Sequence, residues 1–164
     1  MLEEGKKVPK GLEGIIIDSN SITDNPDGKR IKLDELWKKG LVIFYFYPKD
    51  STPGCTIEAR AFQEESKIFK KLNAQVVGCS RDTIKSHCRF IEKQSLEFPL
   101  VSDDTGKITE AFGVWQEKKL YGRIYMGIAR STFIIKNGVV LKSYPEVKVK
   151  VHPEEVINFI KELK

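Results

Sequence analysis

Cysteine is scarce in this chain, with three among 164 residues. So small and odd a number does not build a secreted disulfide scaffold, and any disulfide is expected to be made and broken during function. Long apolar segments are missing as well. The longest run, at 41–47, is too short to cross a bilayer, and the first residues lack the apolar stretch of a signal peptide. We therefore expect a cytoplasmic protein with no membrane partner.

Concentrated charge of one sign is also absent. The net charge of +5 comes from 28 basic and 23 acidic residues spread along the chain. The densest basic pairs, 38–39 and 118–119, lack the interleaved aromatic residues of a nucleic-acid-binding surface, and no nucleic-acid-binding motif is found. We expect a mixed-charge surface and no nucleic-acid partner. The hydrophobic content of 40% is sufficient for one domain spanning residues 1–164.

The most informative segment that is present is LVIFYFYPKDSTPGCTIEARAF, residues 41–62. Its apolar, β-prone residues 42–47 predict a central strand, which Pro48 ends. Thr52 is a natural N-cap for a helix that follows, so Cys55 falls in the first helical turn. Unpaired backbone N–H groups and the positive end of the helix dipole stabilise a thiolate there. This position predicts that Cys55 is a nucleophile.

The rest of the chain alternates strand and helix patterns. The expected elements are entry strands and a short helix within 12–36, a helix at 53–72, a buried strand at 74–80, a helix at 83–94, a strand at 97–101, a short helix at 106–113, an exposed hairpin at 114–126, a hairpin at 130–144 and a helix at 153–163. Asn137-Gly138 has the chemistry of a type I′ turn, and Pro99 places its strand near a sheet edge. The pattern predicts an α/β fold in which helices flank both faces of a mixed β-sheet.

Several short blocks occur in order over residues 30–164. They are PKDSTPGCTIE at 48–58, VVGCSRD at 76–82, FPLVSD at 98–103, FGVW at 112–115, YGRIYMGIARSTF at 121–133 and the HPEEV helix near the end. Together these blocks resemble the peroxiredoxins, specifically the peroxiredoxin Q or bacterioferritin comigratory protein group. The resemblance implies a thioredoxin-like fold and a thiol-dependent peroxidase that reduces hydrogen peroxide and organic hydroperoxides without a metal, haem or other cofactor.

The same resemblance assigns roles to individual residues. Cys55 matches the peroxidatic cysteine, Thr52 and Pro48 match the other motif residues, and Arg130 matches a remote arginine. As the O–O bond breaks, Arg130 and the backbone N–H groups of Gly54 and Cys55 are expected to stabilise the departing oxyanion. The Thr52 hydroxyl is expected to bind the peroxide, and Pro48 to shield the sulfur from water.

Attack leaves Cys55 as a sulfenic acid, which must meet a second thiol. Many relatives carry that thiol five residues later, where this chain has Arg60, and others carry it in the next helix, near Ile91. Cys88 lies one turn before Ile91 and is the leading candidate for an intramolecular disulfide that a thioredoxin-like reductant recycles. Cys79 is expected to fill the core. The alternative is a one-cysteine enzyme resolved by an external thiol.

Other protein classes fit less well. A thioredoxin-like disulfide reductase needs a C-x-x-C pair, which Cys55 does not start. A cysteine hydrolase would pair Cys55 with His87 or His152, but no motif surrounds either histidine. A zinc site built from Cys79, His87 and Cys88 lacks a fourth ligand, so no metal is expected. A non-enzymatic basic binding module would keep its function without Cys55. The resemblance allows a monomer or a weak homodimer.

Overall fold

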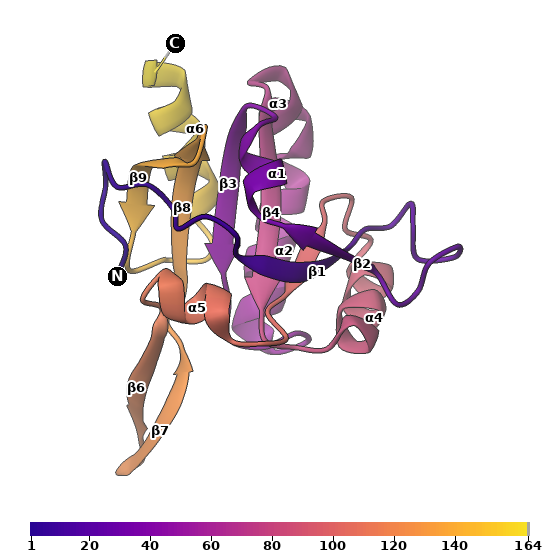
Figure 1. Cartoon of the computed structure of the whole chain (residues 1–164), viewed down its shortest axis with the longest axis vertical. Helices are drawn as coiled ribbons and strands as arrows, with labels where there is room; N and C mark the ends of the chain where they lie inside the picture. The colour runs from indigo at the N-terminus through magenta and orange to yellow at the C-terminus, as the bar shows by residue number, and fades with distance from the viewer. Residues whose placement is uncertain (164) are drawn as a thin grey trace.

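The computed structural model describes residues 1–163 and contains a seven-stranded sheet, helices on both of its faces and a separate two-stranded hairpin (Figure 1). The sheet order is β2-β1-β5-β4-β3-β8-β9. Its strands are β1 Glu13–Ile17, β2 Lys29–Lys32, β3 Leu41–Phe46, β4 Ala74–Ser80, β5 Leu100–Ser102, β8 Ser131–Lys136 and β9 Val139–Tyr144. The β3–β4 and β4–β5 pairs are parallel and the other pairs are antiparallel, which confirms the predicted mixed sheet.

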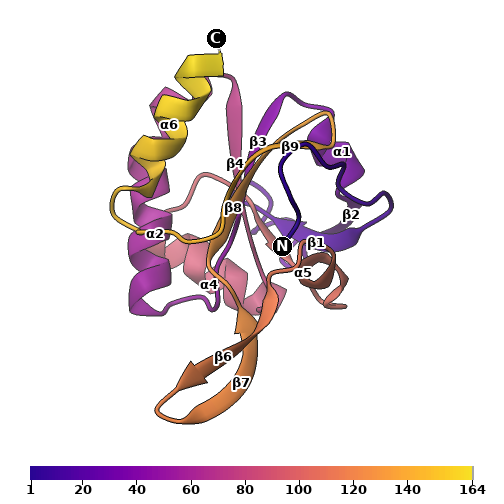
Figure 2. The same ribbon diagram turned by 90° about the vertical axis from the view of Figure 1, so that its left-hand side faces the viewer.

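The helices divide between the two faces of the sheet (Figure 2). They are α1 Asp34–Trp37, α2 Pro53–Glu64, α3 Ser66–Lys71, α4 Ile84–Gln94, α5 Lys107–Ala111 and α6 His152–Leu163. Helices α2, α4 and α6 cover one face, and α1 and α5 lie on the other. No helix in the described part of the chain is long and apolar enough to span a membrane.

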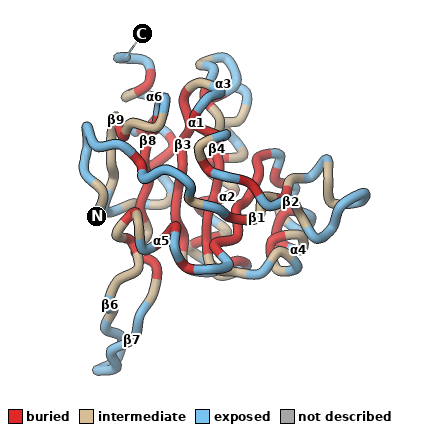
Figure 3. Tube along the Cα trace, in the orientation of Figure 1, coloured by how far each residue is buried: buried red, intermediate tan, exposed pale blue. Residues whose placement is uncertain are grey.

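Strand β3 is the centre of the core, and all six of its residues are buried (Figure 3). Because side chains alternate along a strand, Ile43 and Tyr45 pack into the cluster beneath α2, α4 and α6. Phe44 and Phe46 pack into the opposite cluster with Phe112. A strand that is apolar on both faces therefore ends at the loop that leads to the helix of the predicted nucleophile.

Two predictions about elements were wrong. The helix expected at 53–72 is two helices, because the backbone leaves helical geometry at Glu65 (φ −97°, ψ 11°), whose N–H donates to the Phe62 carbonyl three residues back. The strand after Pro99 is not near an edge, because β5 lies between β1 and β4. Pro99 has no N–H to donate, but it stands just before the strand and its carbonyl accepts a hydrogen bond from the Gly78 N–H.

Both predicted hairpins are present. The turn between β8 and β9 has positive φ at Asn137 (52°) and Gly138 (78°), as a type I′ turn requires. The other hairpin, β6 Trp115–Leu120 and β7 Arg123–Ile128, projects away from the body of the molecule (Figure 1). Its tip is open to solvent, with Tyr121 97% exposed.

Candidate active site

Cys55 lies in the first turn of α2, just after the loop that leaves β3. Thr52 occupies the N-cap position with extended backbone angles (φ −89°, ψ 156°), and Pro53 is the first helical residue. The Thr52 hydroxyl does not cap the helix, which corrects part of the prediction: it donates to the Lys49 carbonyl at 2.7 Å. This bond closes the loop on itself just before Cys55.

Arg130 reaches this helical turn from a distant part of the sequence. It precedes β8, and the β3–β8 register pairs Phe46 with Ser131, so Arg130 stands beside the loop after β3. Its Nη2 donates to the Sγ atom of Cys55 at 3.3 Å, across 75 positions of sequence. Its Nη1 donates to Oε1 of Glu58 at 2.6 Å. One guanidinium therefore joins the sulfur to a buried carboxyl group.

Gly54 makes the close approach of Arg130 possible. A Cβ atom at this position would lie 3.1 Å from Nη2 of Arg130. This distance is shorter than an ordinary van der Waals contact, so a larger residue would displace the guanidinium. A steric requirement thus explains the glycine at this position of the motif, and its backbone N–H is also available to a substrate.

Glu58 belongs to the site, although the sequence did not single it out. It follows Cys55 by three residues, on the same side of α2, and is fully buried. Burial raises its pKa to about 7, although the charge of Arg130 and its hydrogen bond act in the opposite direction. Its Oε2 atom and the buried Tyr45 hydroxyl have no hydrogen-bond partner among residues 1–163. The signal available in the sequence was a carboxylate on the core-facing side of an amphipathic helix.

The surroundings of the sulfur are positively charged. Burial opposes the charge on Arg130, but the negative charges of Glu58 and Cys55 together outweigh burial and raise its pKa. Half-buried Lys118, on β6, interacts electrostatically with this site. Burial and the charge of Arg130 lower its pKa, and the charge of Cys55 opposes this shift. Arg130 thus contacts the sulfur, and Lys118 lies within electrostatic range of it.

None of the three cysteines forms a disulfide. Cys79 is fully buried in β4, where burial raises its pKa well above the usual value, as expected of a core residue. Cys88 lies in α4 and is partly exposed. Its thiol donates to the carbonyl of Pro26 at 3.5 Å, so it faces the loop between β1 and β2.

The two histidines have other partners. Nδ1 of His87 lies 2.7 Å from Oδ2 of Asp50, and Nε2 of His152 lies 2.7 Å from the Thr132 hydroxyl. Among the described residues, neither histidine forms a hydrogen bond with Cys55. A cysteine hydrolase would need such a base, so the geometry argues against that class.

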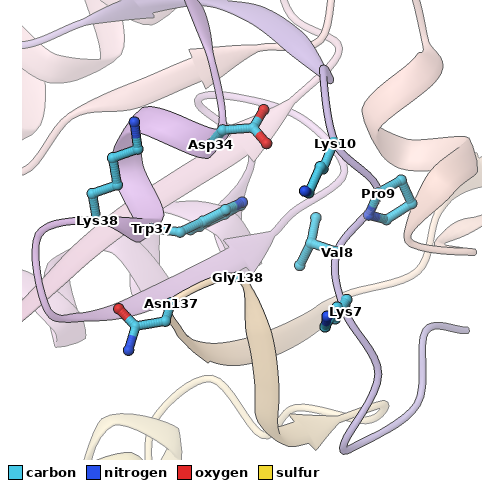
Figure 4. A pocket seen from close by; sticks show the side chains of 9 residues that line it. All are labelled: Lys7, Val8, Pro9, Lys10, Asp34, Trp37, Lys38, Asn137 and Gly138. Atoms are coloured by element: carbon cyan, nitrogen blue, oxygen red, sulfur yellow. The ribbon is translucent and has the colours of Figure 1, made fainter.

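A pocket of about 580 Å³ lies apart from these residues, between the N-terminal segment, α1 and the β8–β9 turn (Figure 4). It is lined by Lys7, Val8, Pro9, Lys10, Asp34, Trp37, Lys38, Asn137 and Gly138. None of these residues was a predicted site residue. The predicted residues that the structure brings together are those around Cys55 and Arg130, whereas Cys88 lies elsewhere.

Comparisons with known proteins show which family this chain resembles. The model of the AhpC/TSA family matches residues 17–144. Peroxiredoxin Bcp of Bacillus subtilis is 44% identical over 137 residues, which cover 83% of this chain and 87% of the relative. Peroxiredoxin Bcp of Xanthomonas campestris is 45% identical over 121 residues, covering 73% and 76%.

Solved structures are similar over nearly the whole chain. Peroxiredoxin Q of Xanthomonas campestris matches with a TM-score of 0.80 and 38% identity, covering 92% of this chain and 90% of that one. A cysteine mutant of Xylella fastidiosa PrxQ matches with a TM-score of 0.86 and 34% identity, covering 99% and 98%. A cysteine mutant of the Xanthomonas protein also matches, with a TM-score of 0.81 and 37% identity, covering 93% of this chain and 92% of that one.

Proposed function

The chain belongs to the AhpC/TSA family, in its peroxiredoxin Q or Bcp group, and is a thiol peroxidase; from this premise we propose that Cys55 is its peroxidatic cysteine. The observation that carries the assignment is the 3.3 Å contact between Nη2 of Arg130 and the Cys55 sulfur at a helix start. A permanent cation and a helix N-terminus together stabilise a thiolate.

In the proposed reaction the Cys55 thiolate attacks one oxygen of hydrogen peroxide or an organic hydroperoxide. A sulfur–oxygen bond forms, the O–O bond breaks, and hydroxide or alkoxide leaves with the electron pair. Arg130 and the backbone N–H groups of Gly54 and Cys55 stabilise the negative charge as it moves to the leaving oxygen. The product on the enzyme is the Cys55 sulfenic acid.

Thr52 and Pro48 are proposed to position the peroxide. The Thr52 hydroxyl donates its hydrogen to the Lys49 carbonyl, so its oxygen can accept a hydrogen bond from the peroxide O–H. Pro48 is half-buried at the end of β3 and limits the access of water to the sulfur. Both residues therefore act on substrate binding more than on the charge of the thiolate.

We further propose that Cys88 resolves the sulfenic acid. Its thiol condenses with Cys55 to give a disulfide and one water, and a thioredoxin-like dithiol then reduces the disulfide. Because Cys88 faces Pro26 in the reduced protein, the first turn of α2 and the start of α4 must both move. The same observation favours the second candidate, a one-cysteine enzyme resolved by an external thiol.

Peroxide consumption with a dithiol donor tests the first assignment. Cys55→Ser should abolish turnover, whereas Cys79→Ser, a change at a buried cysteine in the cluster on the other face of the sheet, should retain it. Retained turnover in Cys55→Ser would refute the role of Cys55. Peptide mapping after one equivalent of peroxide tests the second assignment: a Cys55–Cys88 link supports resolution by Cys88, and a persistent sulfenic acid supports the external thiol.

A further inference from the structure

A buried hydrogen-bond network connects the loop before Cys55 to the helix that carries Cys88. Its centre is Asp50, in the loop between β3 and α2, which is 5% exposed. Oδ2 of Asp50 lies 2.7 Å from Nδ1 of His87 and accepts a hydrogen bond from the Ser86 hydroxyl at 2.8 Å. Oδ1 accepts one from the Tyr47 hydroxyl at 2.5 Å. A single carboxylate of the loop is therefore bonded twice to the first turn of α4.

The backbone of the loop is tied to the same region. The Asp50 N–H donates to Oδ2 of Asp82 at 2.9 Å, just before α4. The same Asp82 oxygen accepts a hydrogen bond from the Ser80 hydroxyl at 2.6 Å. Thr83 caps α4 by accepting from the Ser86 N–H at 3.2 Å. The loop and the start of α4 thus form one hydrogen-bonded unit.

The Asp50–His87 pair must hold a proton between its two members. Nε2 of His87 lies 3.1 Å from the Val101 carbonyl, and a carbonyl oxygen only accepts, so Nε2 carries a proton. Nδ1 faces the Asp50 carboxyl group, so the bond between them needs a second proton on one side or the other. Separating the pair inside the protein would remove a charge-assisted hydrogen bond from Oδ2 of Asp50 and Nδ1 of His87 while both groups remain buried. The loop and α4 are consequently expected to open together.

The far ends of α2 and α4 are fixed independently. Nη1 of Arg60 donates to the Gln94 carbonyl at 2.8 Å, and the Glu97 N–H donates to Oε1 of Gln63 at 2.7 Å. These bonds do not involve the near ends of the two helices, which carry Cys55 and Cys88, so the far ends can stay joined when the near ends move. The Asp50–His87 pair closes that near end.

We propose that the Asp50–His87 pair is a latch that holds the loop between β3 and α2 and the first turn of α4 closed, and that it opposes the rearrangement by which Cys88 reaches Cys55. This inference rests on the proposed roles of the two cysteines. Asp50 and His87 are positioning residues: they touch neither the peroxide nor the sulfur, and they set the balance between the peroxide-reactive form and the form that makes the disulfide.

Two substitutions of His87 separate its two hydrogen bonds. By connectivity, an asparagine amide nitrogen takes the place of Nδ1 and keeps the bond to Asp50, whereas a glutamine amide nitrogen takes the place of Nε2 and keeps the bond to Val101. His87→Gln therefore opens the latch and His87→Asn keeps it. Asp103→Asn is a further control, because this buried carboxylate is bonded to Ile108 and Thr109 of α5 and to neither segment.

Hydrogen exchange of the reduced protein measures the latch without catalysis. In His87→Gln, amides in 53–58 and 84–88 should both exchange at least about tenfold faster than in the wild type, a change of about 1.4 kcal/mol. In His87→Asn and Asp103→Asn they should stay close to the wild-type rates. Equal effects of the two His87 variants, or faster exchange in 84–88 alone, would overturn the proposal. If His87→Gln does not fold, Ser86→Ala, which removes one bond to the same carboxylate, should accelerate both segments by a smaller factor.

Rapid-quench measurement of the disulfide after one equivalent of peroxide gives the functional readout. The rate of Cys55–Cys88 formation should rise severalfold in His87→Gln, and the peroxide concentration that inactivates half of the enzyme by over-oxidation should rise with it. An unchanged rate in a variant with faster exchange would refute the latch as a control of resolution. A wild type that consumes no peroxide, or forms no such disulfide, would instead refute the proposed function, and the exchange data alone would then decide whether the pair joins the two segments.

Discussion

Replacing Glu58 with glutamine is expected to change how the free energy of unfolding depends on pH. Burial raises the pKa of Glu58 from 4.5 to about 7 in the folded protein, against the opposing effect of Arg130. Between these pH values the folded state therefore binds more protons than the unfolded state. The stability that Glu58 contributes is complete below pH 4.5, declines as the pH rises and is lost above about pH 7.

The size of this effect follows from the same two values. The difference between 4.5 and about 7 corresponds to about 3 kcal/mol, because one pKa unit is worth about 1.4 kcal/mol. His152 acts in the opposite direction, since burial lowers its pKa from 6.5 to about 4. Its contribution is complete above pH 6.5 and is lost as the pH falls toward 4. In the wild type these two contributions change the free energy of unfolding in opposite directions as the pH rises. Glu58→Gln removes the contribution of Glu58, and the contribution of His152 remains.

Urea unfolding of the reduced proteins between pH 4.5 and 8 checks this prediction. The free energy of unfolding of the wild type minus that of Glu58→Gln should fall by about 3 kcal/mol as the pH rises across this range. Glu64→Gln, an exposed carboxylate on the same helix, is the matched control and should show a constant difference. A difference for Glu58→Gln that stays constant within about 0.5 kcal/mol would refute the reasoning, because that is the scatter of ordinary surface substitutions.

Three further predictions concern neighbouring residues. Gly54→Ala places a methyl group against Arg130, so the rate constant for peroxide in stopped-flow should fall by about tenfold to a hundredfold with little change in thermal stability; an unchanged rate would contradict a role for that contact. Cys79→Ala should lower the free energy of unfolding by about 1 kcal/mol and leave turnover within about twofold, and a larger loss of turnover would assign Cys79 a chemical role. Arg60→Ala should speed hydrogen exchange near Gln94 but not at 84–88, and faster exchange at both would show that the two ends of α4 are not held independently.

The part of the site that could be predicted is the part that local chemistry determines. A strand that ends at Pro48, an N-cap position at Thr52 and a cysteine three residues later are all read from consecutive residues. The nearness of Arg130 was available only through the family resemblance. Its physical basis is the register that pairs Phe46 with Ser131, and no local pattern encodes a register between strands so far apart.

The residues that sequence reasoning missed depend on burial and on contacts between distant segments. Asp50 reads as a turn residue and His87 as a lone histidine, yet they meet across 37 positions inside the protein. Glu58 reads as one more polar residue of an amphipathic helix, and only the packing of α2 shows that it is enclosed. The break between α2 and α3 at Glu65 was likewise not predicted, because strong helix formers lie on both sides of it.

The β6–β7 hairpin has a practical consequence for labelling this protein. Its base is fixed, because Val114 and Ile128 are buried and the Arg81 guanidinium lies 3.5 Å from the centre of the Trp115 ring. Its tip, in contrast, is open to solvent, with Leu120, Tyr121 and Ile124 each more than half exposed. A short epitope or a dye attachment site spliced in after Tyr121 would therefore stand clear of the core, on an arm whose strand also carries Lys118.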